Sequence, residues 1–150
     1  MTLDPVYRFP KKGRQASRSY IYGVEYRNGD KDFTPLRELH GHDAPCAACL
    51  ARRRSTVLMI PGTIRCPVTR GGNWTREYIG YLMAAKKGFD RTSYICVDVN
   101  AESAIGSSDA YQQGGLLYPV EGYCNVNAGG GLPCGPYVDG NELTCVVCTV

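Results

Sequence analysis

The stretch HGHDAPCAACLARRRSTVLMIPGTIRCP, from His40 to Pro67, holds both histidines of the chain, three of its eight cysteines and its most apolar strand-like segment. Cys46 and Cys49 form one Cys-x-x-Cys motif, and Cys145 and Cys148 form a second one near the C-terminus. Two such motifs joined by zinc are typical of intracellular modules, whereas cysteines joined by disulfides brace small secreted domains. The partner of each cysteine therefore decides the fold.

The composition is that of one globular domain. A chain of 150 residues with 43% hydrophobic and 21% charged residues buries a core of its own. Eleven tyrosines and 18 glycines against three phenylalanines suit β structure with tight turns. The net charge of +3 comes without a basic stripe, so we expect no nucleic-acid partner. No apolar run approaches the roughly 18 residues of a membrane helix, so we expect no membrane insertion.

Residues 1–18 are predicted to form an extended basic arm, with Pro5 and Pro10 and no periodicity, and residues 19–150 a single compact domain. The segment MTLDPVYRFPKKGRQ lacks the apolar core of a secretory signal. Two interpretations remain open on this point. The protein stays inside the cell, or this is the mature chain preceded by a start methionine.

The pattern of the chain predicts an all-β or β-rich fold with short helices. In the segment SYIYGVEYR, Tyr20, Tyr22, Val24 and Tyr26 fall on one face of a strand, and Ile21, Glu25 and Arg27 fall on the other. Further strands are expected at 52–60, resuming at 63–66, and at 93–98, 116–120 and 143–150, with a helical turn at Leu36–Leu39. Residues 74–84 fit a strand better than a helix because of their β-branched and aromatic residues and Gly80. Pro119 suggests an edge strand.

The cysteine count favours disulfides over zinc. The two Cys-x-x-Cys motifs are most of the chain apart and lack knuckle glycines, although His40 and His42 near Cys46 offer metal ligands. An extracellular protein pairs eight cysteines without remainder, whereas an intracellular one must keep the extra four as thiols or ligands.

The pairing itself stays open, because eight cysteines can combine in about a hundred ways. The positions suggest that Cys66 and Cys96, in strands on either side of Trp74, belong together, and that Cys124 and Cys134 close one loop. The two Cys-x-x-Cys motifs would then join each other. The eight cysteines expected in disulfides are Cys46, Cys49, Cys66, Cys96, Cys124, Cys134, Cys145 and Cys148.

Several ordered blocks with cysteines in register cover about two-thirds of the chain. They are HDAPCAACLARRRSTVLMIP, TIRCP, WTREYIGYLMA, RTSYICVD, LLYPVEGYC and LPCGPYVDGNELTCVVCT. In these blocks the chain from His42 onward resembles the short-chain collagen C4-like domains of secreted invertebrate proteins. It also looks like a small feather-star lectin that binds N-acetyllactosamine-type glycans.

The resemblance implies a secreted, disulfide-bonded, extracellular domain of a marine invertebrate, and glycans of the galactose type as partners. It supplies no set of binding residues. The chain has no Gly-X-Y repeat, so the resemblance does not extend to a collagen function.

Candidate binding residues gather around the single tryptophan. A pyranose has an apolar C–H face that needs a flat ring, and a rim of hydroxyls that needs carboxylate, amide or guanidinium groups. Asn73, Trp74, Arg76 and Glu77 supply all of these within a few residues, and His42, Asp43 and Arg91 are candidates to join them. On a strand, Trp74, Arg76 and Tyr78 would share one face, so only part of this set would meet one sugar.

Each of these residues also has a structural interpretation. Trp74 can pack beside a disulfide, His42 and Asp43 can stabilise a loop, and Arg52, Arg53 and Arg54 can form a solvated patch or bind an acidic ligand. Asn73-Trp74-Thr75 is a glycosylation sequon, and a glycan on Asn73 would keep it out of a pocket. The face of Tyr20–Tyr26 is an alternative binding surface.

Catalytic motifs are missing: the chain has no Gly-x-Ser-x-Gly, phosphate loop or His-Glu-x-x-His, and no complete calcium loop. We therefore expect a carbohydrate-binding protein without catalysis, metal or cofactor, acting as a homo-oligomer because weak single sites gain avidity when multiplied. The alternative is a structural or adhesive module of the extracellular matrix that binds proteins.

Overall fold

The computed structural model describes residue 8 and residues 22–27, 33–69, 72–89, 93–109, 114–124 and 131–150. The predicted N-terminal arm, residues 1–18, lies outside these residues except for Arg8. The described residues form a β-rich fold with one short helical element, which confirms the predicted fold class. Three disulfides tie its strands and loops together.

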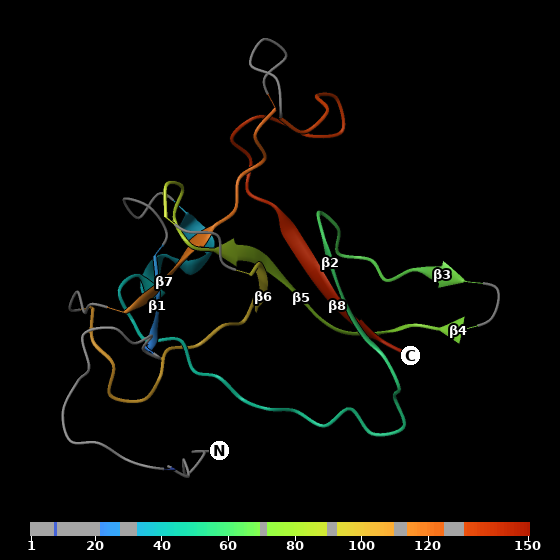
Figure 1. The fold of residues 1–150 in the computed structure, drawn as a ribbon, viewed down its shortest axis with the longest axis horizontal. Helices are drawn as coiled ribbons and strands as arrows, with labels where there is room; N and C mark the ends of the chain where they lie inside the picture. The colour runs from blue at the N-terminus through green and yellow to red at the C-terminus, as the bar shows by residue number, and fades with distance from the viewer. Residues whose placement is uncertain are drawn as a thin grey trace.

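Six strands form one mixed sheet, and two short strands form a separate ribbon (Figure 1). The strand order of the sheet is β1-β7-β5-β8-β2, and β6 pairs with β5 outside this path. β1 and β7 are parallel, and the other pairs are antiparallel. The bounds are β1 Val24–Tyr26, the 3-10 helix η1 Thr34–Leu39, β2 Val57–Pro61, β3 Val68–Thr69, β4 Gly72–Asn73, β5 Thr75–Ala84, β6 Ile95–Asp98, β7 Gly115–Pro119 and β8 Thr144–Thr149.

The longest strand, β5, organises the sheet by pairing with three others. Its first part runs beside β8, and its C-terminal part pairs with β6 and β7. At Gly80 the partners are Asp98 of β6 and Cys145 of β8, so these two strands flank β5 on opposite sides. The prediction of a strand rather than a helix over 74–84 is confirmed, since aromatic and β-branched residues dominate and Gly80 disfavours a helix.

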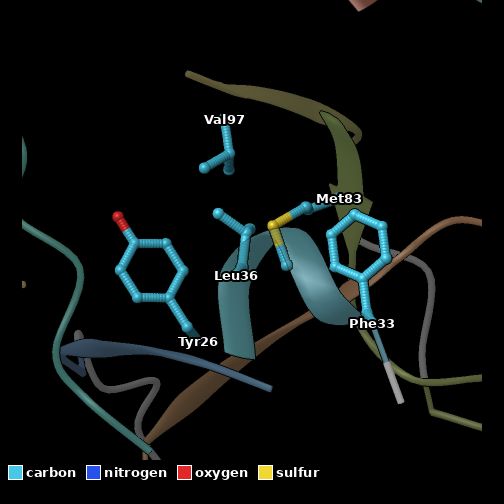
Figure 2. Packing of buried hydrophobic residues seen from close by; sticks show 5 residues of the cluster. All are labelled: Tyr26, Phe33, Leu36, Met83 and Val97. Atoms are coloured by element: carbon cyan, nitrogen blue, oxygen red, sulfur yellow. The ribbon is translucent and has the colours of Figure 1, made fainter. Parts of the chain in front are cut away.

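The main hydrophobic core lies beside the C-terminal part of β5, where η1 packs against it (Figure 2). It consists of residues from β1, β5, β6 and η1 with its preceding residue: Tyr26, Phe33, Leu36, Met83 and Val97. Met83 is fully buried at its centre. The ring of Phe33 meets that of Tyr81 edge-on, with 4.8 Å between the centroids. The predicted helical turn at Leu36–Leu39 lies within η1, although Leu36 itself is at a kink with a φ of −115° and the helical turn proper follows it.

Three predicted strands differ from the structure. The strand expected from residue 52 begins at Val57, because residues 52–53 form a turn in which Arg53 has a φ of 60°. The resumption expected at 63–66 is wrong, since the chain turns at Gly62 and this segment forms no strand. The edge position expected from Pro119 is also wrong: β7 lies between β1 and β5, and Pro119 is its last residue.

In β1 the alternation of buried and exposed residues departs from the prediction. Only one face of this strand was expected to be buried, but Tyr26 on one face is 4% exposed and Glu25 on the other is only 1% exposed. Its carboxylate accepts a hydrogen bond from the Arg27 guanidinium, with 3.0 Å between Oε2 and Nη2. A buried carboxylate is stable only when it is paired, and the neighbouring arginine on the same face provides the partner.

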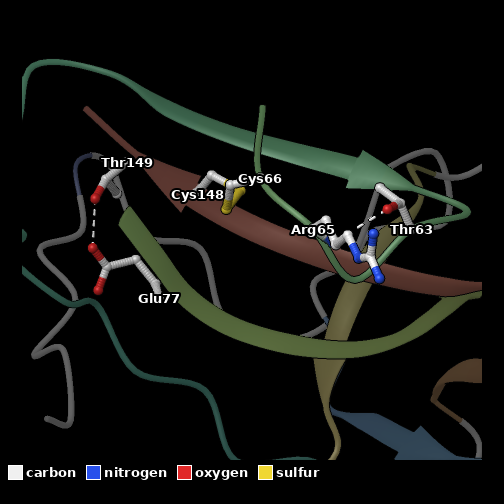
Figure 3. The surroundings of a disulfide bond; sticks show 6 residues. All are labelled: Thr63, Arg65, Cys66, Glu77, Cys148 and Thr149. Carbon is white, nitrogen blue, oxygen red and sulfur yellow. Dashed lines mark hydrogen bonds between the residues drawn. A yellow bond between two sulfur atoms is a disulfide. The ribbon is translucent and has the colours of Figure 1, made fainter. Parts of the chain in front are cut away.

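The C-terminal Cys-x-x-Cys motif lies within β8, and its two cysteine side chains point to opposite faces of the sheet because they are three positions apart. Cys148 bonds to Cys66 of the segment that follows β2, and Cys145 bonds to Cys96 of β6 (Figure 3 shows the first bond). Both cysteines of β8 are fully buried. The two bonds therefore brace both faces of one central strand.

These pairings correct the predicted connectivity. Cys66 does not bond to Cys96, and the two Cys-x-x-Cys motifs do not join each other. The predicted bond between Cys124 and Cys134 is confirmed. Cys46 and Cys49 are free and exposed, so the expected four disulfides are three. The physical reason is tertiary: β6 and the chain after β2 approach β8 more closely than the segment around Cys46 does.

The bond between Cys96 and Cys145 spans β5. In a flat sheet, strands on either side of a third lie about 9.5 Å apart, whereas these two Cα atoms are 5.7 Å apart. The sheet therefore bends sharply about β5 at Gly80. A Cβ atom on residue 80 would lie 2.0 Å from the carbonyl oxygen of Val97 and 3.1 Å from the sulfur of Cys96. The bend thus requires a residue without a side chain.

Candidate functional site

The residues predicted around the tryptophan lie at the start of β5. Asn73 in β4 and Arg76 in β5 are exposed, and Trp74 between these strands is half-buried. Arg76 pairs with Cys148 and Tyr78 with Val147, so Glu77 is an extra residue that forms a β-bulge. Because Cys148 and Val147 face opposite sides of β8, Arg76 and Tyr78 do so too. The prediction that they share one face is therefore wrong.

The bulge gives Glu77 a structural partner. The hydroxyl of Thr149, which is 2% exposed, donates a hydrogen bond to the Glu77 carboxylate (Figure 3). This contact satisfies a buried hydroxyl at the C-terminal end of β8. The Glu77 carboxylate is thus hydrogen-bonded to the neighbouring strand β8.

We expect Glu77→Ala to lower the free energy of unfolding by about 1–3 kcal/mol, because it leaves the buried Thr149 hydroxyl without its acceptor. Thr149→Val removes the hydroxyl itself, and in that background Glu77→Ala should cost less than about 1 kcal/mol. Urea unfolding of the four proteins of this double-mutant cycle gives the coupling. Equal effects of Glu77→Ala in both backgrounds would contradict the contact.

His42 and Asp43 lie elsewhere, beside β1. The His42 ring shares a hydrogen bond with the Ser107 hydroxyl, with 3.1 Å between Nδ1 and Oγ. Asp43 forms a β-bridge with Glu25, and its carbonyl accepts a hydrogen bond from the Ala104 amide. β1 and β4 stand at opposite ends of the fold in Figure 1, so the structure does not bring this pair to the tryptophan. Arg91 lies outside the described residues.

The alternative face of Tyr20–Tyr26 is not a continuous surface in the described residues, where Tyr20 is not included. Tyr22 is 58% exposed, whereas Tyr26 is 4% exposed and donates its hydroxyl to the Glu102 carbonyl. Burial raises the pKa of Tyr26. Burial, and then the nearby Asp98 and Cys49, also raise the pKa of Tyr78, whose hydroxyl donates to the Cys96 carbonyl at 3.0 Å. The hydroxyls of Tyr26 and Tyr78 therefore hold the fold together through hydrogen bonds to backbone carbonyls.

A hollow lined by tyrosines lies on another part of the molecule, beside β2 and the C-terminal part of β5. Its volume is about 440 Å³. Apolar residues of β2, β5 and the loops beside β7 and β8 form part of its lining: Met59, Pro61, Leu82, Val120 and Leu143. Tyrosines and other residues of the loops complete it: Tyr94, Tyr123, Tyr137, Leu132, Gly62, Gly131 and Glu121.

A second hollow of about 900 Å³ continues the first, because Tyr94, Val120, Glu121 and Tyr123 line both. It adds charged and aromatic residues from the turn after β5 and from the loop before β8, chiefly Lys86, Lys87, Phe89, Tyr118 and Asp139. We call the joined hollows the tyrosine groove. Tyr94 is 59% and Tyr123 51% exposed, so their rings are open to a ligand.

The walls of the groove are held by short-range contacts. The disulfide between Cys124, which follows Tyr123, and Cys134 joins the two segments that carry Tyr123 and Leu132, and the amide of Leu132 donates to the Tyr123 carbonyl at 2.8 Å. The amide of Cys124 donates to the Asp139 carboxylate at 2.7 Å. These contacts hold Tyr123, Leu132 and Asp139 in place before a ligand arrives, which reduces the entropy lost on binding.

The groove combines flat rings with charged groups. Glu121 lines both hollows, and the ammonium of Lys86 lies 5.9 Å from the centre of the Tyr118 ring. Rings of this kind stack on apolar surfaces, while carboxylates accept hydrogen bonds from hydroxyls. The groove can therefore hold a neutral, hydroxyl-rich ligand.

The composition of the chain carries one sign of this site that no motif shows. Tyrosine outnumbers phenylalanine eleven to three, which indicates rings with a wet hydroxyl edge. Tyr94, Tyr123 and Tyr137 come from three separate segments, and their meeting depends on the pairing of β5 with β6, β7 and β8. Spacing along the chain carries no such information.

Among the described residues, no group of three or more histidine, cysteine, aspartate or glutamate side chains is placed to hold a metal ion. The same residues include no helix long and apolar enough to cross a membrane. No protein-family model matches this chain, and no solved structure matches it either. The resemblance to short-chain collagen C4-like domains and to a feather-star lectin therefore stays a prediction.

Proposed function

We propose that this chain is a non-catalytic carbohydrate-binding protein whose ligand occupies the tyrosine groove. The observation that carries the proposal is that two exposed tyrosines, Tyr94 and Tyr123, line the same open hollow as Glu121. A pyranose has an apolar face that stacks on such rings and hydroxyls that a carboxylate can accept hydrogen bonds from. The proposal places the site in the tyrosine groove and not at Trp74.

The sugar is of the galactose or N-acetyllactosamine type, and this preference rests on the resemblance. Six of the eight cysteines form disulfides, and such bonds persist in oxidising compartments. We therefore place the protein in the extracellular space. The groove binds its glycan through rings and carboxylates, so binding does not require a metal ion.

A glycan array probed with the full chain tests the proposal. We expect galactose-terminated glycans to bind, free galactose or lactose to compete, and EDTA to leave the signal unchanged. A signal abolished by EDTA and restored by calcium would contradict the metal-free site. The absence of any glycan signal at high protein concentration would instead favour a structural or adhesive matrix module that binds proteins.

Variants locate the site. We expect Tyr94→Ala and Tyr123→Ala each to weaken glycan binding by about five- to thirtyfold, because the lost ring contact amounts to roughly 1–2 kcal/mol. Tyr22→Ala is the matched control, since Tyr22 is 58% exposed and lies outside the groove. Titration calorimetry with the best glycan of the array gives the dissociation constants.

Trp74→Ala separates the two candidate sites. A folded Trp74→Ala protein should bind the glycan as the wild type does, because Trp74 does not line the groove. Loss of binding in this variant, together with full binding by Tyr94→Ala, would move the site to the start of β5. Asn73 is exposed there and belongs to a glycosylation sequon. Mass spectrometry of the protein would show whether a glycan is attached to it.

A further inference from the structure

Arginine side chains from three segments of the chain lie around the C-terminal end of β8. The sequence shows a run of three before β2, and the fold adds one that follows β2 and one in β5. All are exposed: Arg52, Arg53, Arg54, Arg65 and Arg76. We call these five residues the arginine surface.

Cys148 places Arg65 and Arg76 on the same side of the sheet. Arg76 pairs with Cys148 across the ladder of β5 and β8, and residues paired in this way point to the same face. The side chain of Cys148 bonds to Cys66, the residue after Arg65, with 5.9 Å between the two Cα atoms (Figure 3). The Cα atoms of Arg65 and Arg76 therefore lie within about 15 Å of each other.

The run from Arg52 to Arg54 is attached to the same end of β8. The amide of the next residue, Ser55, donates to the Val150 carbonyl at 2.8 Å, and its hydroxyl donates to the same oxygen at 3.3 Å. Arg53 has a φ of 60° and is the only non-glycine residue of the described ranges with a positive φ. This conformation is unfavourable for a residue with a side chain, and such strain gathers at functional sites.

The arginine surface has no acidic partner of its own. From residue 44 to residue 76 the sequence contains no aspartate or glutamate, and the Glu77 carboxylate accepts a hydrogen bond from Thr149. Within the described residues, no salt bridge joins any of the five guanidinium groups to a carboxylate. Acidic residues lie before the other end of β8, where Glu121 and Glu142 form a β-bridge. Opposite charges are thus separated along this strand.

We propose that the arginine surface binds a sulfated polysaccharide. A guanidinium group is a planar fork of donors that matches the oxygens of a sulfate, and all five cations here are arginines. A single sulfate would reach only one of the three segments, whereas a chain with repeated sulfates can meet them together. The disulfides favour this polyanion over nucleic acid, because they persist in the oxidising extracellular space.

The arginine surface is separate from the tyrosine groove. Met59 lines the groove and pairs with Val147, so it points to the face of the sheet opposite to that of Cys148 and Arg76. The proposal therefore does not depend on what the groove binds. It rests on the extracellular placement only for the choice between the two kinds of polyanion.

Heparin, a sulfated polysaccharide, is the probe, and calorimetry with the full chain at several salt concentrations is the measurement. We expect binding at physiological salt that weakens as the salt concentration rises, because each contact releases counterions. Dextran, which is uncharged, should not bind. No binding of heparin even at low salt would overturn the proposal. Binding of duplex DNA as tight as that of heparin would overturn the choice of sulfate and favour nucleic acid.

A pair of double variants with the same loss of charge tests the location. Arg65→Gln with Arg76→Gln should weaken heparin binding about fivefold or more and lower the slope of log affinity against log salt by about two. Arg8→Gln with Arg37→Gln is the matched control, because both residues are exposed and belong to other segments. Equal weakening by the two variants would show attraction to the overall charge and overturn the proposal.

A second double variant keeps the test independent of the sheet. Arg52→Gln with Arg54→Gln changes residues outside the strands, so it should keep the unfolding midpoint of the wild type and still lose heparin affinity to a similar extent. Glycan binding in the tyrosine groove should be unchanged in all of these variants. Wild-type heparin affinity in a folded Arg52→Gln, Arg54→Gln protein would contradict a surface made of three segments.

Discussion

Replacing Gly80 by alanine is expected to prevent stable folding, at a cost of more than about 4 kcal/mol. The new Cβ atom would lie 2.0 Å from the Val97 carbonyl oxygen and 2.7 Å from its carbonyl carbon. Both are backbone atoms of β6, which is held to β5 by pairing and to β8 by the bond between Cys96 and Cys145. No side-chain rotation relieves the overlap, so the strands must separate.

Two glycine variants separate this clash from other effects. Gly23→Ala should change the free energy of unfolding by less than about 1 kcal/mol, because no atom lies within 4 Å of the added Cβ. Gly62→Ala also meets open space but has a φ of 75°, so it isolates backbone strain of about 1 kcal/mol. Urea unfolding and the yield of protein with three disulfides give the comparison. Wild-type stability of Gly80→Ala would refute the close approach of β5 and β6.

Removing either disulfide of β8 is expected to cost about 4 kcal/mol in the chain-entropy account, where the gain grows with the length of the closed loop. Cys66 and Cys148 are 82 residues apart, and Cys96 and Cys145 are 49 apart. Cys124 and Cys134 are only 10 apart, so their bond should contribute less than about 3 kcal/mol. Each pair is replaced by alanines.

The expected order of unfolding midpoints follows from this comparison. The loop variant should be the most stable of the three, and the two variants of β8 should be close to each other and far below the wild type. Because Cys145 and Cys148 are fully buried, their loss also leaves cavities on both faces of β8. A loop variant less stable than the two β8 variants would contradict this ranking.

Strand positions could be predicted from local patterns in the chain. Residues 74–84, 93–98, 116–120 and 143–150 were all expected as strands, and β5, β6, β7 and β8 lie within or nearly within these limits. Alternation and β-propensity act over neighbouring residues, so they are visible without a fold. The exceptions have local causes that compete with propensity, such as the turn at residues 52–53.

The candidate site was less accessible to prediction. The residues chosen around Trp74 carry the right chemistry, but a bulge at Glu77 turns Arg76 and Tyr78 to different faces, and His42 lies at the other end of the fold. A bulge depends on how β5 and β8 align, and one residue of shift reverses every side chain beyond it. Tyr94, Tyr123 and Tyr137 meet only because their segments approach after folding.

By itself, the sequence determined that this protein is β-rich, that cysteines brace it and that tyrosine rings are plentiful for its surface, because these properties follow from composition and short-range pattern. The tertiary structure alone decided which cysteines pair. The two cysteines of the second Cys-x-x-Cys motif lie on opposite faces of β8, so each bonds to a different segment, Cys145 to Cys96 and Cys148 to Cys66. The first motif lies in an exposed extended segment outside the strands, and its two cysteines remain thiols.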